Sequence, residues 1–269
     1  MGTLIQSEFE GSEDYELDVE KIEWKGKTVE IVELSRKNVF KVEAMIRTDS
    51  NYRNTSDDTK GIDSIRKGYG GSSSYWLKQL KEITDTGDKS NESNDGYGYE
   101  KIVENLVIAI DIENSTHLNS DKNGKKVGRK AVAKRISELD IKDLIEYLKS
   151  PRKASGKEFE LIDIIQIPTE EYEEKRHLSF ATKFCHFACS YLFKGTDEAD
   201  NFSIYDTVLK KALPKYIKKY LPEVTKISKY EDDYGTYIGY IDKIIAKLKE
   251  EEISRNGFDH LLWYYHKGR

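Results

Sequence analysis

The chain has 269 residues, of which 35% are charged and 37% are hydrophobic, and its formal net charge is −5. This length allows one large or two modest domains with a hydrophobic core and excludes a hairpin-sized module. The net negative charge, taken alone, argues against a nucleic-acid partner. Because 18 tyrosines, 9 phenylalanines and 3 tryptophans supply core material, we expect a folded protein.

The first third of the sequence predicts some β-structure. Residues 20–34 alternate apolar and polar side chains around a Lys-Gly-Lys turn, and residues 40–46 predict another short strand. Residues 73–84 have helical spacing, whereas the small, polar residues of 85–98 predict a flexible surface connection. We therefore expect an α+β N-terminal region over residues 1–95.

Apolar residues recur at helical spacing through the rest of the chain, and Asp140 opens one such segment as an N-cap residue. The predicted helices cover residues 99–112, 126–137, 140–149, 178–194, 206–220, 236–252 and 258–266. The expected fold class is mainly α with a β-containing N-terminal part, that is α+β. The helical domain over residues 99–269 would carry the candidate site.

The two cysteines, Cys185 and Cys189, are four residues apart, which places them on one helical face without the geometry of a disulfide. This indicates a reducing, intracellular setting. The acidic N-terminus lacks the layout of a signal peptide, and the longest apolar run, residues 102–110, is too short to span a bilayer. We expect a cytoplasmic protein with no membrane partner.

Charge is unevenly distributed. Between Lys122 and Lys157 there are twelve basic and four acidic residues, a local charge of +8 that leaves −13 for the remainder. Such a region is typical of a phosphate-binding face and equally of a solvated helix surface. Its candidates for contact with a DNA backbone are Lys125, Lys126, Arg129, Lys130, Lys134 and Arg135.

Residues 178–193, LSFATKFCHFACSYLF, form the most apolar segment of the chain. On a helix, Phe180, Phe184 and Phe187 share one face, while Lys183 and His186 lie on the other. Lys183 would stand in the first turn of a largely buried helix. It is either a lysine that extends from the edge of the core to water or a functional amine.

A second segment, residues 202–213, contains Asp206 where it would cap a helix N-terminus and be held ionised. The pair of segments resembles the helix-hairpin-helix DNA glycosylases, in particular the branch that resembles 8-oxoguanine DNA glycosylase. In that family a Gly-hydrophobic-Gly hairpin runs into a Thr-Lys pair, and a catalytic aspartate follows in a hydrophobic-Asp-Thr/Val context. Ser179–Lys183 would match the hairpin and lysine, and Ile204–Val208 the aspartate segment.

This resemblance implies a glycosylase-like helical C-terminal domain in which Lys183 and Asp206 are catalytic. It also implies that Ser179 and Thr182 contact the DNA backbone. Both hairpin glycines are replaced, by Ser179 and Ala181, and glycine is the residue that lets backbone amides approach a phosphate closely.

A base-binding pocket near Lys183 would be aromatic, and burial would lower the pKa of the amine. His186 is either a second polar group there or an ordinary core histidine. Trp263, in the last predicted helix, either stacks on a base or belongs to a helix that docks on the core through Phe258 and Leu262. The pocket candidates are Phe180, His186, Phe187, Tyr205 and Trp263.

The function expected from this resemblance is a DNA N-glycosylase for a modified or damaged base, with or without Schiff-base lyase activity and without a cofactor. The alternative is a non-catalytic binding module of the same fold, part of a bacterial multiprotein system of the defence type, with a protein partner at its N-terminal region. A metal-dependent nuclease or hydrolase ranks last, because the many acidic residues show no catalytic spacing with histidines. Cys185, His186 and Cys189 also lack a fourth ligand for zinc.

Overall fold

The computed structural model describes residues 16–48, 72–114, 116, 118, 128–151, 159–166, 177–228, 230 and 233–267. In these residues the fold is mainly helical, with ten α-helices and one two-stranded antiparallel sheet, as the α+β expectation required. The elements are β1 (Val19–Trp24), β2 (Lys27–Val32), α2 (Arg36–Thr48), α5 (Ser73–Thr86), α6 (Tyr99–Glu113), α7 (Gly128–Ser137), α8 (Ile141–Lys149), α9 (Glu160–Gln166), α10 (Leu178–Leu192), α11 (Thr207–Tyr220), α12 (Tyr234–Lys247) and α13 (Arg255–His266).

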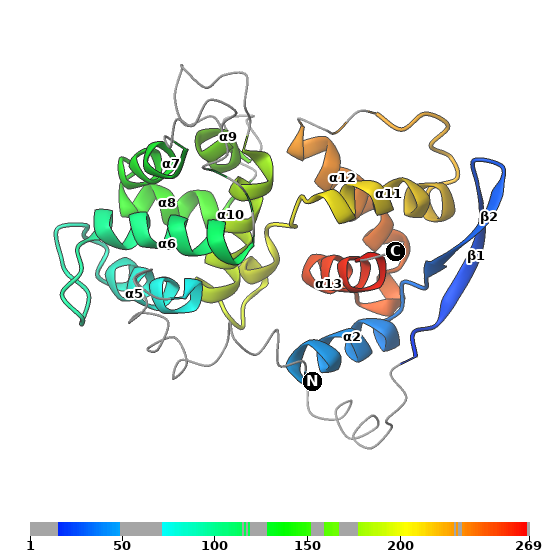
Figure 1. The fold of residues 1–269 in the computed structure, drawn as a ribbon, viewed down its shortest axis with the longest axis horizontal. Coiled ribbons are helices and arrows are strands. Elements are labelled where there is room, and N and C mark those ends of the chain that lie inside the picture. Colours follow the sequence, from blue (N-terminus) through cyan, green and yellow to red (C-terminus); the bar gives the residue numbers. More distant parts are fainter. Residues whose placement is uncertain are drawn as a thin grey trace.

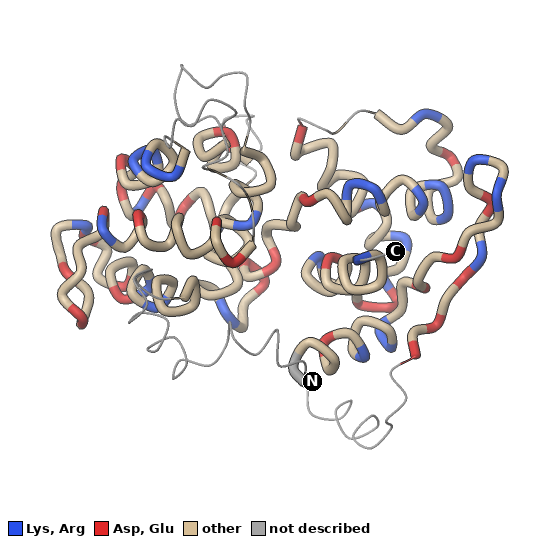
Figure 2. The backbone as a smooth tube through the Cα atoms, viewed as in Figure 1, with Lys and Arg blue, Asp and Glu red and all other residues tan. Residues whose placement is uncertain are grey.

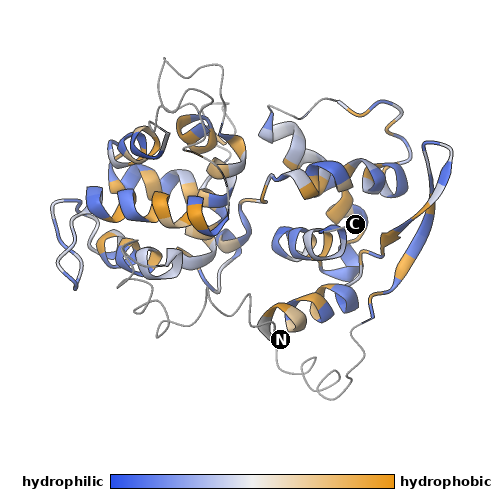
Figure 3. Ribbon diagram, in the orientation of Figure 1, coloured by the Kyte–Doolittle hydropathy of each residue, from blue (hydrophilic) through white to orange (hydrophobic). Residues whose placement is uncertain are grey.

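The helices form two lobes (Figure 1). The first lobe consists of α5 to α10, and α10 contacts α5, α6, α8 and α9 within it. The second lobe consists of β1, β2, α2 and α11 to α13, and there α13 contacts α2, α11, α12 and β2. Each lobe is therefore organised around one central helix, α10 or α13. Hydrophobic residues recur along the helices of both lobes (Figure 3), and many of their side chains belong to the buried core.

Packing does not follow the expected division near residue 95. The Tyr216 and Tyr220 hydroxyls of α11 accept hydrogen bonds from Val32 N at 3.2 Å and Leu34 N at 3.3 Å, which tie the N-terminal hairpin to the C-terminal helices. By contrast, α5 packs on α6 and α10 in the first lobe. The N-terminal and C-terminal parts of the chain thus build one lobe together.

The segment expected to be a flexible connection, residues 85–98, is a hydrogen-bonded loop. Gly87 closes α5 with φ +69°, a left-handed conformation that favours glycine. Asp95 accepts hydrogen bonds from the Tyr75 hydroxyl at 2.7 Å and from Gln79 Nε2 at 3.0 Å. These contacts fasten the loop to α5.

The predicted hairpin is present. β1 and β2 pair with Val19 opposite Val32 and Trp24 opposite Lys27. Lys25 and Gly26 both have positive φ, as a two-residue type I′ turn requires. The sequence signal here is local, which explains why the prediction is confirmed.

The strand predicted over residues 40–46 is wrong, because this segment lies in α2. The Ser35 carbonyl and hydroxyl accept hydrogen bonds from Val39 N and Asn38 N, which starts the helix. The side chain of Asn38 is buried and donates to two backbone carbonyls, so it anchors the first turn. Apolar residues that alternate over so short a run fit a helix as well as a strand, and the cap decides between them.

The helices predicted after residue 72 are all present, with ends shifted by a few residues. Asp140 caps α8 as expected and accepts a hydrogen bond from Lys142 N. α9 is an additional helix of 7 residues, too short for its spacing to be recognised in the sequence. The described residues include no helix long and apolar enough to cross a membrane.

A proline inside α11 is matched by a distant tyrosine. Pro214 has no N–H to donate to the carbonyl of Lys210, one helical turn earlier. The Tyr230 hydroxyl, from the loop before α12, donates to this carbonyl at 3.1 Å. The loop therefore replaces a hydrogen bond that the helix itself cannot make.

We expect Tyr230→Phe to lower the free energy of unfolding by about 1 kcal/mol, the usual net value of one hydrogen bond. In a Pro214→Ala background the loss shrinks, since the backbone N–H of the alanine can donate to the same carbonyl. Urea unfolding of the four proteins measures this coupling. Tyr240→Phe, which removes the acceptor of Ser228 N, is the matched control and should cost the same in both backgrounds. Equal losses for Tyr230→Phe with and without Pro214 would contradict the assignment.

Candidate functional site

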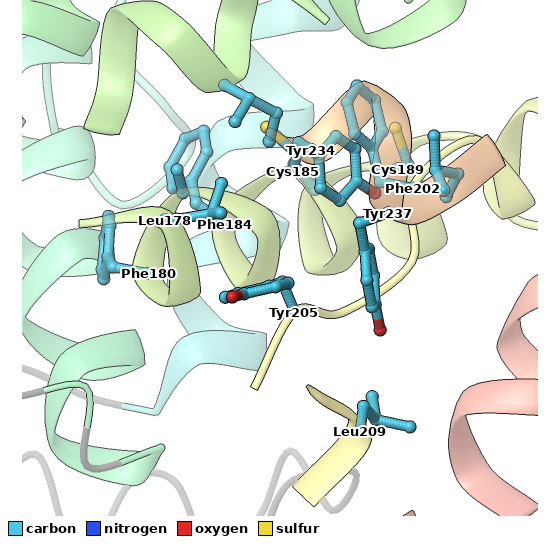
Figure 4. Packing of buried hydrophobic residues seen from close by; sticks show 14 of the residues in the cluster. Leu178, Phe180, Phe184, Cys185, Cys189, Phe202, Tyr205, Leu209, Tyr234 and Tyr237 are labelled. Carbon is cyan, nitrogen blue, oxygen red and sulfur yellow. The ribbon is translucent and has the colours of Figure 1, made fainter. Parts of the chain in front are cut away.

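The apolar face of α10 is part of the core, as predicted. Phe180, Phe184, Cys185 and Ala188 are fully buried, and Figure 4 shows three of them beside Leu178. The opposite, more polar face does not point into bulk water either, because Thr182 and His186 are also buried. These polar groups face the connection between the two lobes.

That connection is an extended stretch, residues 202–206, which we call the junction segment. From the first lobe, Thr182 Oγ1 accepts a hydrogen bond from Tyr205 N at 3.0 Å, and His186 Nδ1 lies 2.9 Å from the Phe202 carbonyl oxygen. Because a carbonyl can only accept, His186 carries its proton on Nδ1. Burial lowers the pKa of His186 to about 4, so the ring is neutral near pH 7. His186 is thus a satisfied core histidine.

The second lobe binds the middle of the junction segment. The Tyr234 hydroxyl accepts from Ser203 N and donates to Ser203 O, both at 2.8 Å. The Asp259 carboxyl accepts from Ser203 Oγ at 2.9 Å and from Ile204 N at 2.7 Å, and the Tyr237 hydroxyl donates to Ile204 O at 2.8 Å. Every backbone N–H and C=O of Ser203 and Ile204 thus has a side-chain partner.

Aromatic rings fill the space around these bonds. Figure 4 shows Tyr234 beside Phe202 and Cys185, with Tyr205 and Tyr237 close by. The Tyr205 and Tyr237 rings meet edge to face with centroids 5.0 Å apart. The rings shield much of the junction from solvent, which strengthens its hydrogen bonds and the effect of nearby charges.

Asp206 ends the junction segment and begins α11. Its Oδ1 accepts a hydrogen bond from Leu209 N at 2.8 Å, so the predicted N-cap is confirmed. The preceding residue, Tyr205, is bonded to Thr182, the neighbour of Lys183 on α10. One hydrogen bond therefore links the neighbours of the two predicted catalytic residues, although the Lys183 amine and the Asp206 carboxylate, both within the described residues, form no direct ion pair.

The side chain of Lys183 is half-buried. Its Nζ donates to the carbonyl oxygen of Asn114 at 3.4 Å, at the C-terminal end of α6, where the helix dipole favours a cation. Burial lowers the pKa of Lys183, and the negative charge of Asp206 offsets part of this effect. The result is an amine more readily deprotonated than an ordinary surface lysine, in the electrostatic field of a carboxylate.

The remaining pocket candidates have different surroundings. Phe180 is fully buried and Tyr205 nearly so, which assigns both rings to the core. Phe187 is half-buried against the His186 ring at 5.3 Å. Trp263 is half-buried, with the Lys267 amine 4.0 Å from its ring centroid, while Phe258 and Leu262 dock α13 on the core.

The DNA-backbone candidates of the basic region divide into two groups. Lys130, Lys134 and Arg135 are exposed on α7, whereas Lys125 and Lys126 lie outside the described residues. Arg129 differs, because its Nε donates to Asp111 Oδ2 at 2.7 Å and the Asp111 side chain is almost fully buried. The prediction of a DNA contact for Arg129 is therefore corrected to that of a structural ion pair.

Asp111 shows why this ion pair is structural. Its Oδ1 accepts hydrogen bonds from Thr116 Oγ1 and Leu118 N at 2.6 and 2.9 Å. Burial by itself raises the pKa of Asp111. The two hydrogen bonds and the charge of Arg129 lower this pKa by more, so it lies below the usual range of an aspartate. The charged carboxylate holds the residues that follow α6.

The hairpin match also needs correction. Ser179, Phe180 and Ala181 lie in the first turn of α10 rather than in a hairpin. Thr182 is fully buried, and its hydroxyl donates to Ser179 O at 3.2 Å while accepting from Tyr205 N. Thr182 therefore cannot contact a phosphate in this arrangement, and Ser179 is half-buried beside it.

Within the described ranges, no group of three or more histidines, cysteines or acidic residues is arranged to hold a metal ion. Cys185 and Cys189 are free and buried, and burial raises the pKa of both thiols. The comparisons with protein-family models, curated proteins and solved structures found no match to this chain.

Asp259 is the site residue that the sequence analysis missed. Its signal was an acidic residue between Phe258 and Leu261, on the stripe that docks α13 against the core. A buried carboxyl on an apolar stripe requires partners elsewhere in the fold, and here they are Ser203 and Ile204. Burial raises the pKa of Asp259 well above its usual range, although these two hydrogen bonds oppose the shift.

We expect Asp259→Asn to gain stability relative to wild type as pH rises above about 4, the ordinary pKa of an aspartate. A carboxyl whose folded pKa is raised stabilises the protein at low pH, and this contribution is lost as pH approaches the folded pKa. Asparagine can accept from Ile204 N and donate to Ser203 Oγ without titrating. Urea unfolding at several pH values measures the difference. Asp259→Ala, which removes both hydrogen bonds, should be less stable than both the wild type and Asp259→Asn. A difference between Asp259→Asn and wild type that stays constant over this pH range would contradict the assignment.

We expect Asp206→Asn to lower the pKa of Lys183 further, because it removes the charge that raises this pKa. A pH titration of the Lys183 side-chain carbon signals by NMR measures the shift. The matched control is Asp233→Asn, which alters the N-cap of α12 in the same way. Equal Lys183 titrations in the two variants would exclude the proposed electrostatic pairing.

Proposed function

We propose that this protein is a DNA base-excision enzyme, an N-glycosylase for a modified or damaged base in which Lys183 and Asp206 act together. The observation that carries the proposal is the surroundings of the Lys183 amine, which belongs to a half-buried side chain, donates to the Asn114 carbonyl and lies in the field of Asp206. The resemblance of the segments around these two residues to helix-hairpin-helix glycosylases supports the same assignment. The free, buried Cys185 and Cys189 support a cytoplasmic setting.

The chemistry requires the target nucleotide to leave the stack, since its sugar carbon cannot be reached within a duplex. The neutral Lys183 amine attacks the anomeric carbon while the bond from that carbon to the base breaks. The base departs with the bonding electrons and takes up a proton, and the amine loses one. Opening of the sugar then gives a Schiff base, from which elimination cleaves the strand.

Asp206 has two roles in this proposal. As the N-cap of α11 it is fixed in position by Leu209 N, so it does not need to reorganise during the reaction. Its negative charge stabilises the positive charge that develops on the sugar. The carboxylate also accepts the proton released by Lys183. The exposed cations of α7, Lys130, Lys134 and Arg135, would contact the DNA backbone.

Borohydride trapping tests the covalent step. Wild-type protein should form a covalent adduct with a duplex that carries an abasic site, and Lys183→Gln should abolish the adduct because glutamine cannot form a Schiff base. Lys194→Gln is the matched control, since Lys194 is exposed just beyond α10. If the Lys183→Gln variant still forms the adduct, another residue is the nucleophile and the assignment of Lys183 is wrong.

Base release gives a second readout that does not depend on lyase activity. Across duplexes that carry modified bases, Asp206→Asn should reduce the rate by about 10²- to 10⁴-fold, the range expected for a positioned acid or base. Asp233→Asn should retain the wild-type rate. Absence of both the adduct and base release in wild-type protein would exclude the enzyme.

A second candidate function, a non-catalytic binding module, is favoured by one specific observation. The residues matched to the hairpin lie in a helix, and Thr182 is used inside the protein. A partner could then bind the N-terminal sheet, which has only two strands and leaves β1 and β2 each with one neighbour in the described fold. A copurifying protein whose binding is lost on altering β1, together with no DNA affinity, would support the module over the enzyme.

A further inference from the structure

The most uniformly charged element of the second lobe is α11. Its sequence, TVLKKALPKYIKKY, contains five lysines and no acidic residue. Figure 2 shows several basic positions along this helix after the acidic residue at its start. The described part of the basic region recognised in the sequence, residues 128–151, lies in the first lobe, so this helix is a separate feature.

Three of the lysines form a stripe on one face. Lys211, Lys215 and Lys218 follow one another at intervals of four and three residues, which places them in a row along the helix. Leu213 and Tyr216 lie on the opposite face and are buried. Lys211 and Lys218 are exposed, and Lys215 is half-buried.

The stripe is not neutralised by the rest of the described chain. Lys219, next to it, pairs with Glu20 of β1. No carboxylate of the residues seen in the structure lies within ion-pair distance of Lys211, Lys215 or Lys218. Like charges at these spacings repel and destabilise a helix, so the row is unfavourable for α11 in isolation. An anionic partner would offset this repulsion.

The dimensions of the stripe suit a nucleic-acid backbone. Two helical turns separate Lys211 from Lys218, about 10 Å along the axis. One DNA strand carries a phosphate per about 3.4 Å of helix axis, so the row could lie along about three phosphates. Asp206 is the N-cap of α11, so the stripe and one residue of the candidate site belong to the same helix.

We propose that Lys211, Lys215 and Lys218 form a contact surface for the phosphate backbone of duplex DNA. The inference rests on the proposed function and extends it, since it places a DNA contact on the second lobe in addition to α7 on the first. Such contacts fix the position of the duplex and carry no base specificity.

The test is the salt dependence of duplex binding, measured by fluorescence anisotropy with the full chain. In the variant Lys211→Gln/Lys215→Gln/Lys218→Gln, the slope of log K against log salt should become shallower by about 2.7, or about 0.9 for each phosphate that a lysine no longer neutralises. Lys215→Gln alone should remove about 0.9. Glutamine keeps the helix propensity of lysine, so α11 should remain folded.

The matched control is Lys78→Gln/Lys89→Gln/Lys194→Gln, which makes the same change in net charge at exposed positions outside both the basic region and α11. Its slope should equal that of wild type. If the α11 variant also keeps the wild-type slope, or if both variants become shallower by the same amount, the surface does not bind the backbone. In that case the proposed enzyme activity would still be supported by formation of the covalent adduct and by base release.

Two further outcomes separate this inference from the proposed function. A shallower slope for the α11 variant in a protein that forms no adduct and releases no base would support the surface and exclude the enzyme. A wild-type protein that does not bind duplex DNA would overturn the surface and the enzyme together.

Discussion

The hydrogen bonds to Ser203 and Ile204 are the interaction on which the arrangement of the two lobes depends. An extended segment buried between helices has no neighbouring strand, yet its backbone groups still need partners. Tyr234, Tyr237 and Asp259 provide them from α12 and α13. Side chains of the second lobe thus make the hydrogen bonds that neighbouring strands would make in a sheet. A buried segment whose polar groups are satisfied in this way has few alternative positions.

The candidate site follows from this constraint. Thr182 holds Tyr205 from the first lobe, so the residue after Tyr205, Asp206, begins α11 near the position of Lys183. Lys183 is covered because α10 is the central helix of its lobe, and the end of α6 supplies a carbonyl for the amine. The fixed position of the Asp206 carboxylate therefore results from the way the junction segment is bound, whereas the lowered pKa of Lys183 results from burial and is partly offset by Asp206.

The features that the sequence predicted well are local ones. The Lys-Gly-Lys turn and the caps Asp140 and Asp206 each involve residues only a few positions apart, and all three are present. The strand expected over residues 40–46 failed because a short apolar alternation does not outweigh a helix cap at Ser35. Local sequence signals therefore predict helix or strand reliably only where no second local signal favours the other type.

The partners of buried polar residues could not be predicted, because they are distant in sequence. Thr182 was expected to bind a phosphate, yet its hydroxyl binds the backbone N–H of Tyr205. Arg129 was expected to contact DNA, yet it pairs with Asp111. No periodicity reveals such pairs. The pairing of Lys183 with Asp206 was expected only from a family resemblance, and the interaction seen between them is the effect of the Asp206 charge on the pKa of Lys183.

Native-state hydrogen exchange at the junction tests the central claim most directly. If side chains of both lobes hold the segment, the amides of Ser203, Ile204 and Tyr205 should exchange only through global unfolding, as slowly as those in the middle of α10. Exchange of these three amides at rates typical of a solvent-exposed loop, while α10 remains protected, would contradict it.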